Sequence, residues 1–212
     1  MGRSERDLVA ALRAELAAID PGRPCDRAAE SAGLAGALAT RRTAVGRLLV
    51  RLRRAPRAVE SGAADLAPFG WDTAPEHCRL AWLRGRFLAR GSLSLAGGRT
   101  HLEFVVESTE AAILAGRLAD VGLPAAWRIR RGRGVVTWKS GDTVGTFLRR
   151  IGAGAALLEL EARQVSRALR GELNRVLNAE SANLQRAVGA AGRHLAAIRL
   201  LEAAPTFLTR RT

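Results

Sequence analysis

Residues able to support catalysis or hold a metal are few and scattered in this chain of 212 residues. Cys25 and Cys78 are its only cysteines, and neither belongs to a CxxC pair or lies near a pair of histidines. Neither a disulfide framework nor a zinc site is therefore indicated. The three histidines are scattered, the acids form no recognisable pair, and there is no GxSxG or P-loop motif. The sequence predicts a protein that is not an enzyme and has no cofactor and no metal.

A basic stretch between residues 126 and 139 offers a different chemistry, the binding of an anion. Basic and apolar residues alternate, so Trp127 and Ile129 should face one side of a strand and Arg128 and Arg130 the other. The candidate DNA contacts in this stretch are Arg128, Arg130, Arg131, Arg133 and Lys139. Two interpretations stay open: arginines that face a groove of DNA, or a solvated face partly neutralised by glutamates of the neighbouring strand.

A second basic group lies in residues 41–57, which hold arginines and no acid. Apolar residues there recur at helical spacing, which predicts a helix with a basic face opposite its apolar face. The candidate DNA contacts on this basic face are Arg47, Arg51 and Arg54. They could clamp phosphates, or they could form a solvated helix face.

The whole chain carries a formal net charge of +14. Such an excess favours polyanions, with nucleic acid ahead of acidic membranes or acidic partner proteins. Lys139 is the only lysine, which suggests the codon bias of a GC-rich genome, but codon bias does not explain the excess charge. The N-terminus is charged and amphipathic rather than a signal peptide, and no apolar run approaches the ~20 residues of a membrane span. We expect a cytoplasmic, nucleoid-associated protein with no membrane partner.

The elements that must position these residues follow from hydrophobic periodicity. Helices are predicted over 4–19, 26–39 and 43–54, and a linker follows. Residues 74–155 then read as αββαββα, with strands over 92–95, 101–107, 126–130 and 134–139. The remainder is helical. The predicted class is α+β, in four segments: an N-terminal helical region (1–57), a linker (58–73), the αββαββα domain (74–155) and a helical extension (156–212).

Two segments resemble a known family. Residues 82–92, WLRGRFLARGS, resemble the LAGLIDADG helix, in which small residues such as Gly85 let two helices pack backbone to backbone. Residues 174–184, NRVLNAESANL, are similar to the N-R-x-x-N-x-[ED]-x-A-N-L signature of the WhiA family of sporulation and cell-division regulators. The signature positions are Asn174, Arg175, Asn178, Glu180 and Asn183. The resemblance covers residues 74–203 well and residues 4–38 weakly.

The resemblance implies DNA binding without cleavage. LAGLIDADG endonucleases cut DNA with Mg²⁺ held by one carboxylate from each repeat, and that position is occupied here by Arg90, with Ala37 as the nearest equivalent in the first repeat. Arg90 would contact phosphate instead, and double-stranded DNA is the expected partner. The alternative is a protein-interaction module that regulates another transcription factor without touching DNA. The asparagines of the signature either link helices or contact DNA.

The chain departs from the family pattern in two places. The first repeat is shortened to its helices, with no recognisable set of four strands, so a second chain could complete the sheet through close packing of helices at Gly85, giving a homodimer. The C-terminal helix-turn-helix domain that reads promoter DNA in this family is expected to be missing or truncated.

Overall fold

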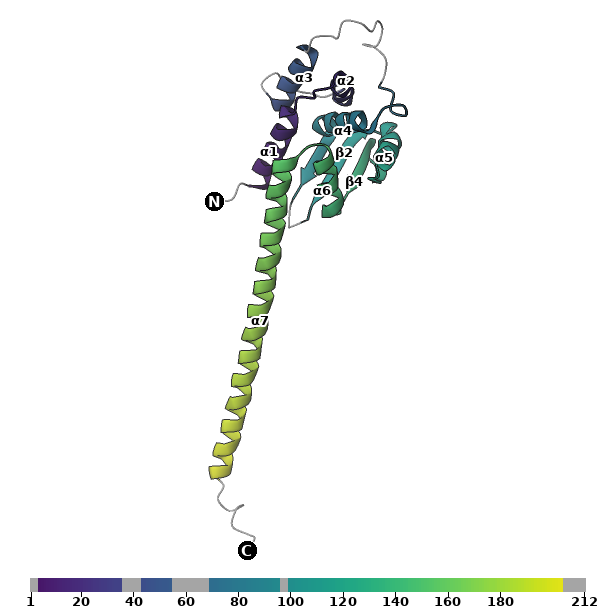
Figure 1. Ribbon diagram of the computed structural model, residues 1–212. Coiled ribbons are helices and arrows are strands. Elements are labelled where there is room, and N and C mark those ends of the chain that lie inside the picture. Colours follow the sequence, from purple (N-terminus) through teal and green to yellow (C-terminus); the bar gives the residue numbers. More distant parts are fainter. Residues whose placement is uncertain (1–3, 36–42, 55–68, 96–98, 204–212) are drawn as a thin grey trace. The chain divides into compact units, whose positions relative to one another are not determined.

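The computed structural model describes residues 4–35, 43–54, 69–95 and 99–203 (Figure 1). The N-terminal part consists of helices α1 (Glu5–Ala18), α2 (Pro24–Gly33) and α3 (Ala44–Arg54). Ser4 caps α1, because its hydroxyl accepts from the Asp7 amide at 3.2 Å and the Asp7 carboxylate accepts from the Ser4 amide at 3.0 Å. Pro24 opens α2 at a position where a missing N–H is harmless. The residues described between Ser4 and Arg54 form helices and turns, without strands.

The αββαββα order predicted for the central part is confirmed. Its elements are α4 (Glu76–Arg90), β1 (Gly91–Ser94), β2 (His101–Glu107), α5 (Glu110–Asp120), β3 (Ala126–Arg130), β4 (Arg133–Trp138) and α6 (Gly141–Arg150). The strands form one antiparallel sheet in the order β1-β2-β4-β3, so β3 lies at an edge. The α+β class follows directly from this arrangement.

One face of the sheet carries the core. Residues that pair across the strands share a face, so Phe104 and its partner Val136 point the same way as Leu102 and Trp138. Helices α4, α5 and α6 cover this face. Phe104 meets Phe87 of α4 and Phe147 of α6 edge to face, at centroid distances of 6.2 and 5.9 Å. The opposite face, called here the outer face, is the one that remains for a partner.

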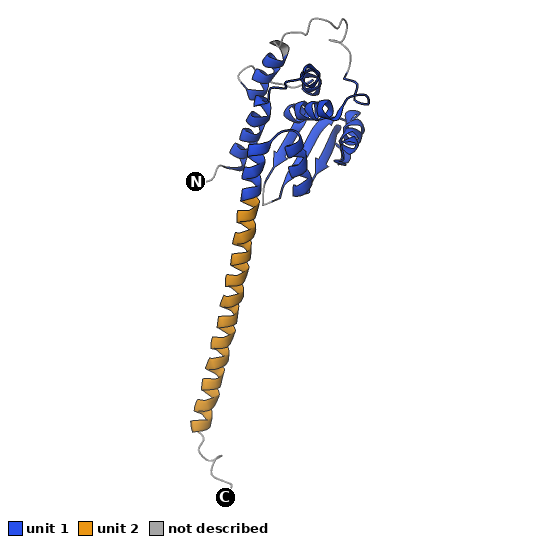
Figure 2. Ribbon diagram, viewed as in Figure 1, with its two compact units in different colours: residues 1–162 blue, residues 163–212 orange. Residues whose placement is uncertain are grey.

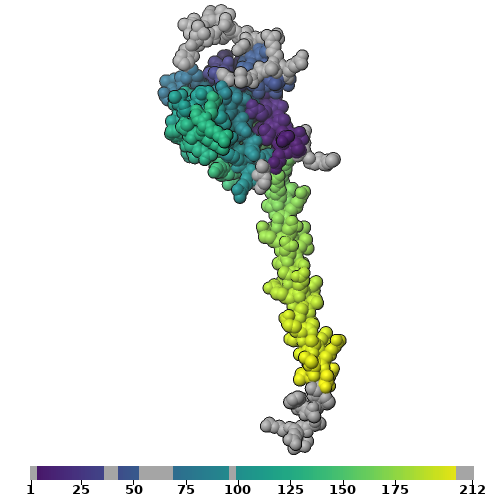
Figure 3. Space-filling model, turned by 180° about the vertical axis from the view of Figure 1, so that it is seen from behind, coloured from purple at the N-terminus to yellow at the C-terminus, as the bar shows by residue number. Residues whose placement is uncertain are grey.

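The N-terminal helices pack into the same compact unit as the sheet. This unit comprises residues 1–162 and is blue in Figure 2. Helix α2 packs along α4, and α1 contacts α3, α4 and β1. Seen from behind in Figure 3, α1 and the sheet-bearing part form one continuous surface. The N-terminal helices and the sheet-bearing part therefore share one core.

The second unit comprises residues 163–212, and its described part is helical. Helix α7 (Gly154–Ala203) begins in the first unit and is continuous, in agreement with the helical extension predicted for this region. From Arg163 onward nearly every side chain is exposed. Within the described ranges, no helix combines the length and the apolar character that crossing a membrane requires.

Candidate nucleic-acid interface

The outer face of the sheet holds the basic hairpin. In the register of β3 with β4, Arg128 pairs with Val135 and Arg130 with Arg133, whereas Trp127 and Ile129 pair with residues of the core face. The alternation predicted for β3 is therefore confirmed. Because β3 is an edge strand, Trp127 and Ile129 are still about half exposed, at 49% and 50%. The hairpin thus presents cations on one side and a partly covered apolar strip on the other.

Two arginines of this hairpin are available to a partner. Arg128 and Arg130 are exposed, and no carboxylate of the described residues pairs with either side chain. Arg133 differs, because its Nη1 donates to Glu107 Oε1 at 2.6 Å. The neutralisation by glutamates that the sequence suggested therefore reaches Arg133 and leaves the other two side chains open.

The turn of the hairpin also presents a cation. Arg131 and Gly132 have φ values of 50° and 73°, both in the left-handed region that the tight turns joining antiparallel strands require. Glycine adopts this conformation at little cost, but arginine does so only against a steric penalty. Arg131 is exposed at the tip, and Lys139 is exposed where β4 ends. Lys139 and Arg128 also line a hollow beside Trp127 and Trp138.

Arg90 is the last residue of α4, at the junction with β1. Its side chain is partly buried, and its Nε has no hydrogen-bond partner among the described residues. Arg13 of α1 reaches the same junction, where it donates to the Gly91 carbonyl at 3.0 Å and to the Leu88 carbonyl. Burial lowers the pKa of Arg13. Two guanidinium groups therefore meet at this junction, and guanidinium cannot ligate a divalent cation.

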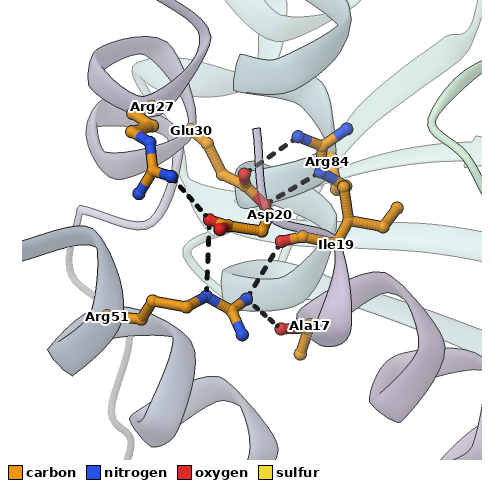
Figure 4. Close-up of polar contacts among 7 residues, drawn as sticks. All are labelled: Ala17, Ile19, Asp20, Arg27, Glu30, Arg51 and Arg84. Atoms are coloured by element: carbon orange, nitrogen blue, oxygen red, sulfur yellow. Dashed lines mark hydrogen bonds and ion pairs between the residues drawn. The ribbon is translucent and has the colours of Figure 1, made fainter. Parts of the chain in front are cut away.

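The arginines of α3 divide into three cases. Arg47 is exposed. Arg51 serves the fold, because its Nη2 donates to the Ala17 and Ile19 carbonyls at 2.8 and 2.9 Å and so closes the end of α1 (Figure 4). The side chain of Arg54 lies outside the described residues. Of the three candidates on α3, Arg47 is thus at the surface and Arg51 is committed to the fold.

The five signature residues on α7 all lie in the second unit and are exposed. Asn183 accepts a hydrogen bond from Arg186, one turn further along. No hydrogen bond within the described part joins Asn174 or Asn178 to another helix. A role in linking helices within this chain therefore has no support from their contacts.

Gly85 packs within the chain rather than against a second copy. A Cβ at this position would lie 2.3 Å from the Glu30 carbonyl oxygen, and a Cβ at Gly33 would lie 2.1 Å from the Trp82 carbonyl oxygen. Backbones of α2 and α4 therefore meet at these two glycines. The close contact expected at Gly85 is therefore filled by α2 of the same chain, and the homodimer stays a prediction.

Sequence reasoning missed two parts of this region. Arg13 was not singled out, although its place on the polar face of α1 is visible in the sequence, because nothing local tells which strand it reaches. The tryptophans also differ in their exposure. Trp82 and Trp138 are core residues at 6% and 5% exposure, whereas Trp127 is exposed. Arg117 stacks over Trp82, 4.6 Å from the ring centroid, and burial lowers its pKa.

Comparison with known proteins gives a consistent family. The model of the WhiA LAGLIDADG-like domain matches residues 79–170. The relatives that match include three bacterial proteins named "Probable cell division protein WhiA". The one from Desulforudis audaxviator is 41% identical over 59% of this chain and 41% of its own length. The one from Symbiobacterium thermophilum is 31% identical over 94% of this chain and 81% of its own length. The one from Clostridium perfringens is 39% identical over 60% and 40%.

Two of these three alignments thus span only about two fifths of the relative. The alignment with the Symbiobacterium protein extends over 255 positions, more than this chain has residues, so it includes positions where the relative has residues and this chain has none.

Solved structures agree on the fold. Full-length DUF199/WhiA from "Thermatoga maritima" superposes with a TM-score of 0.66 at 22% identity, covering 92% of this chain and 78% of that one. The N-terminal LAGLIDADG domain of DUF199/WhiA superposes with a TM-score of 0.55 at 20% identity, covering 69% and 93%.

Proposed function

This chain belongs to the WhiA family, and on that premise we propose that it binds double-stranded DNA without cutting it and regulates transcription in cell division. The observation that carries the proposal is the pair of exposed arginines on the outer face, Arg128 and Arg130, which no described carboxylate neutralises. The link to cell division rests on the names of the relatives.

The charge balance supports a polyanion as the ligand. A net charge of +14 attracts nucleic acid over a distance set by salt, and the arginines of β3 and its turn supply planar donors suited to phosphate oxygens. An antiparallel hairpin is narrow enough to enter the major groove. Contacts of this kind, without base readout, typically give affinities of roughly 10⁻⁴ to 10⁻⁶ M at physiological salt.

Absence of cleavage follows from the chemistry proposed for Arg90. Phosphodiester hydrolysis by this fold needs carboxylates that hold divalent cations at the phosphates. With Arg90 and Arg13 at the junction of α4 and β1, the site would repel a cation and attract a phosphate instead. The proposed role of Arg90 is therefore binding.

The test is a titration of duplex DNA at several salt concentrations. The logarithm of the binding constant should fall with the logarithm of salt concentration, by about 0.9 for each phosphate contact. The double variant Arg128→Ala/Arg130→Ala should bind more weakly and lose about two units of slope.

Arg149→Ala is the control for the single variant Arg128→Ala. Arg149 lies on α6, on the helix-covered side of the sheet. Its replacement by alanine removes the same charge as Arg128→Ala. It should leave the slope unchanged. A slope near zero for the unmodified protein, or equal losses in both single variants, would refute the proposal.

The alternative function, binding of another regulator protein, gains support from α7. Large apolar side chains on its second-unit part are half or more exposed, among them Val165, Leu169, Leu173, Leu184 and Val188. An exposed apolar stripe of this extent is typical of a protein-interaction surface. Under this alternative, Leu169→Glu would abolish copurification of a regulator protein while the DNA titration showed no binding by the unmodified chain.

A further inference from the structure

Four side chains that can ligate a metal meet where α2 and α4 begin. Cys25 and Asp26 are the second and third residues of α2, and His77 and Cys78 are the second and third residues of α4. The four ligand atoms all lie within 4.8 Å of one another. His77 Nδ1 is 2.6 Å from Asp26 Oδ1 and 3.4 Å from Cys78 Sγ.

The close contact between α2 and α4 brings these residues together. Gly33 lies against Trp82 and Arg86, and Gly85 lies against Glu30 and Leu34, so the two helices cross symmetrically. Each pair of candidate ligands precedes its glycine by the same number of residues, which places both pairs at the same end of the helix pair. The cluster is thus as rigid as the α2–α4 contact itself.

The donor set selects the metal. Two thiolates, an imidazole and a carboxylate are the ligands that Zn²⁺ takes in tetrahedral geometry, whereas Mg²⁺ and Ca²⁺ require oxygen. Zinc bond lengths of about 2.3 Å to sulfur and 2.0 Å to nitrogen imply a sulfur–nitrogen separation of about 3.5 Å. The 3.4 Å between Cys78 Sγ and His77 Nδ1 matches this separation. The His77–Asp26 contact would open by several tenths of an ångström to admit the ion.

We propose that Cys25, Asp26, His77 and Cys78 form a structural zinc site that joins the first turns of α2 and α4. Cys78 is buried and Cys25 is exposed, so the ion would enter from the Cys25 side. Four protein ligands leave no open coordination position, which fits a structural rather than a catalytic centre. The site lies at the opposite end of α4 from Arg90, so it is independent of the proposed DNA contacts.

The test uses the full chain, reduced and stripped with a chelator, then titrated with Zn²⁺ against a chromophoric competitor. Co²⁺ serves as a second probe, because thiolate ligands give it a strong near-ultraviolet charge-transfer band and tetrahedral geometry intense visible bands. We expect one equivalent to bind. Cys25→Ser and His77→Ala should each weaken Zn²⁺ binding by about 100-fold or more. His194→Ala is the matched control, because His194 is an exposed histidine of the second unit, and it should change nothing.

A thermal melt separates loss of the site from loss of the fold. Cys25 is exposed, so Cys25→Ser should melt like the unmodified protein when both are free of metal. Added Zn²⁺ should raise the Tm of the unmodified protein and leave that of Cys25→Ser unchanged. The proposal fails if the reduced protein binds no Zn²⁺ at micromolar concentration, or if it binds equally well after Cys25→Ser. It fails equally if the two cysteines form a disulfide whose reduction creates no zinc affinity.

Discussion

At the scale of single residues, the most deeply buried ion pair among the described residues is that between Glu30 and Arg84. Arg84 donates from Nε and Nη2 to the two carboxylate oxygens of Glu30 at 2.8 and 2.9 Å, and the Glu30 side chain has no exposed surface (Figure 4). Arg84 also donates to the Ile151 carbonyl at 3.4 Å. The pair joins α2 to α4 inside the core, so its charges depend on one another.

Removing the carboxylate should therefore be costly. Glu30→Ala leaves the Arg84 guanidinium buried without its counter-ion, and we expect the free energy of unfolding to fall by about 3–5 kcal/mol. Urea unfolding followed by circular dichroism measures this change. Glu161→Ala is the control, because it breaks a pair with Arg149 at 3.0 Å whose side chains are 45% and 62% exposed. That variant should lose less than about 1 kcal/mol. Comparable losses in the two variants would contradict this account.

The direction of a side chain was predictable only where neighbouring residues of the same element determine it. The alternation of residues 127–130 fixed which side chains of β3 face outward, because successive residues of a strand point to opposite faces. The partners of Arg51 were not predictable in the same way. They lie at the end of α1, so the role of Arg51 in the fold was not visible from the sequence around it.

At the scale of elements, hydrophobic periodicity predicted most of the fold. The strands expected over 101–107 and 126–130 are β2 and β3, and the other two differ by one residue. The helix expected over 26–39 is α2, which ends at Gly33; residues 36–42 lie outside the described part. The pairing of helices was harder to predict from the sequence. A close backbone contact requires only small residues, and many positions have them.

The grouping of the four residues of the proposed zinc site was not predicted for this reason. Neither cysteine has a partner nearby in the sequence, and the histidine beside Cys78 pairs with residues about fifty positions earlier. Aligning Cys25 with Cys78 shifts the two helices by one residue relative to each other. Aligning Gly33 with Gly85 places Cys25 opposite His77 and Asp26 opposite Cys78. The spacing from the glycines, rather than the cysteines themselves, therefore indicates which residues lie opposite one another.

The glycine contact gives a prediction about the α2–α4 pair. In Gly85→Ala the new Cβ would lie 2.3 Å from the Glu30 carbonyl oxygen, which is backbone and cannot turn aside. The helices must separate, and we expect a loss of about 1–3 kcal/mol in the free energy of unfolding. Gly116→Ala is the control. It lies in α5 with nothing within 4 Å of the added Cβ, and it should gain about 0.5–1 kcal/mol from helix propensity. Denaturant unfolding should therefore show opposite signs, and a neutral Gly85→Ala would exclude the close contact.

At the scale of the whole molecule, the two units derive their stability from different sources. The first unit buries aromatic and aliphatic side chains from helices and strands in one core. The part of α7 beyond Ala162 buries almost none, since Leu169, Leu173 and Leu195 are 63%, 58% and 57% exposed. Without tertiary packing a helix depends on intrinsic propensity and on pairs along its own surface, which give little stability.

Amide hydrogen exchange should therefore divide the chain at the boundary of the units. We expect amides of β2, β4 and α4 to exchange only through global or near-global unfolding, whereas amides of residues 165–198 exchange through local fraying, faster by orders of magnitude. Mass spectrometry of peptic peptides measures both in one experiment, and the peptides of α5 serve as an internal reference for a packed helix. Exchange should not depend on protein concentration if the helix is uncovered in solution. Protection of residues 165–198 equal to that of β2 would contradict the prediction, because it requires their apolar side chains to be buried against another surface.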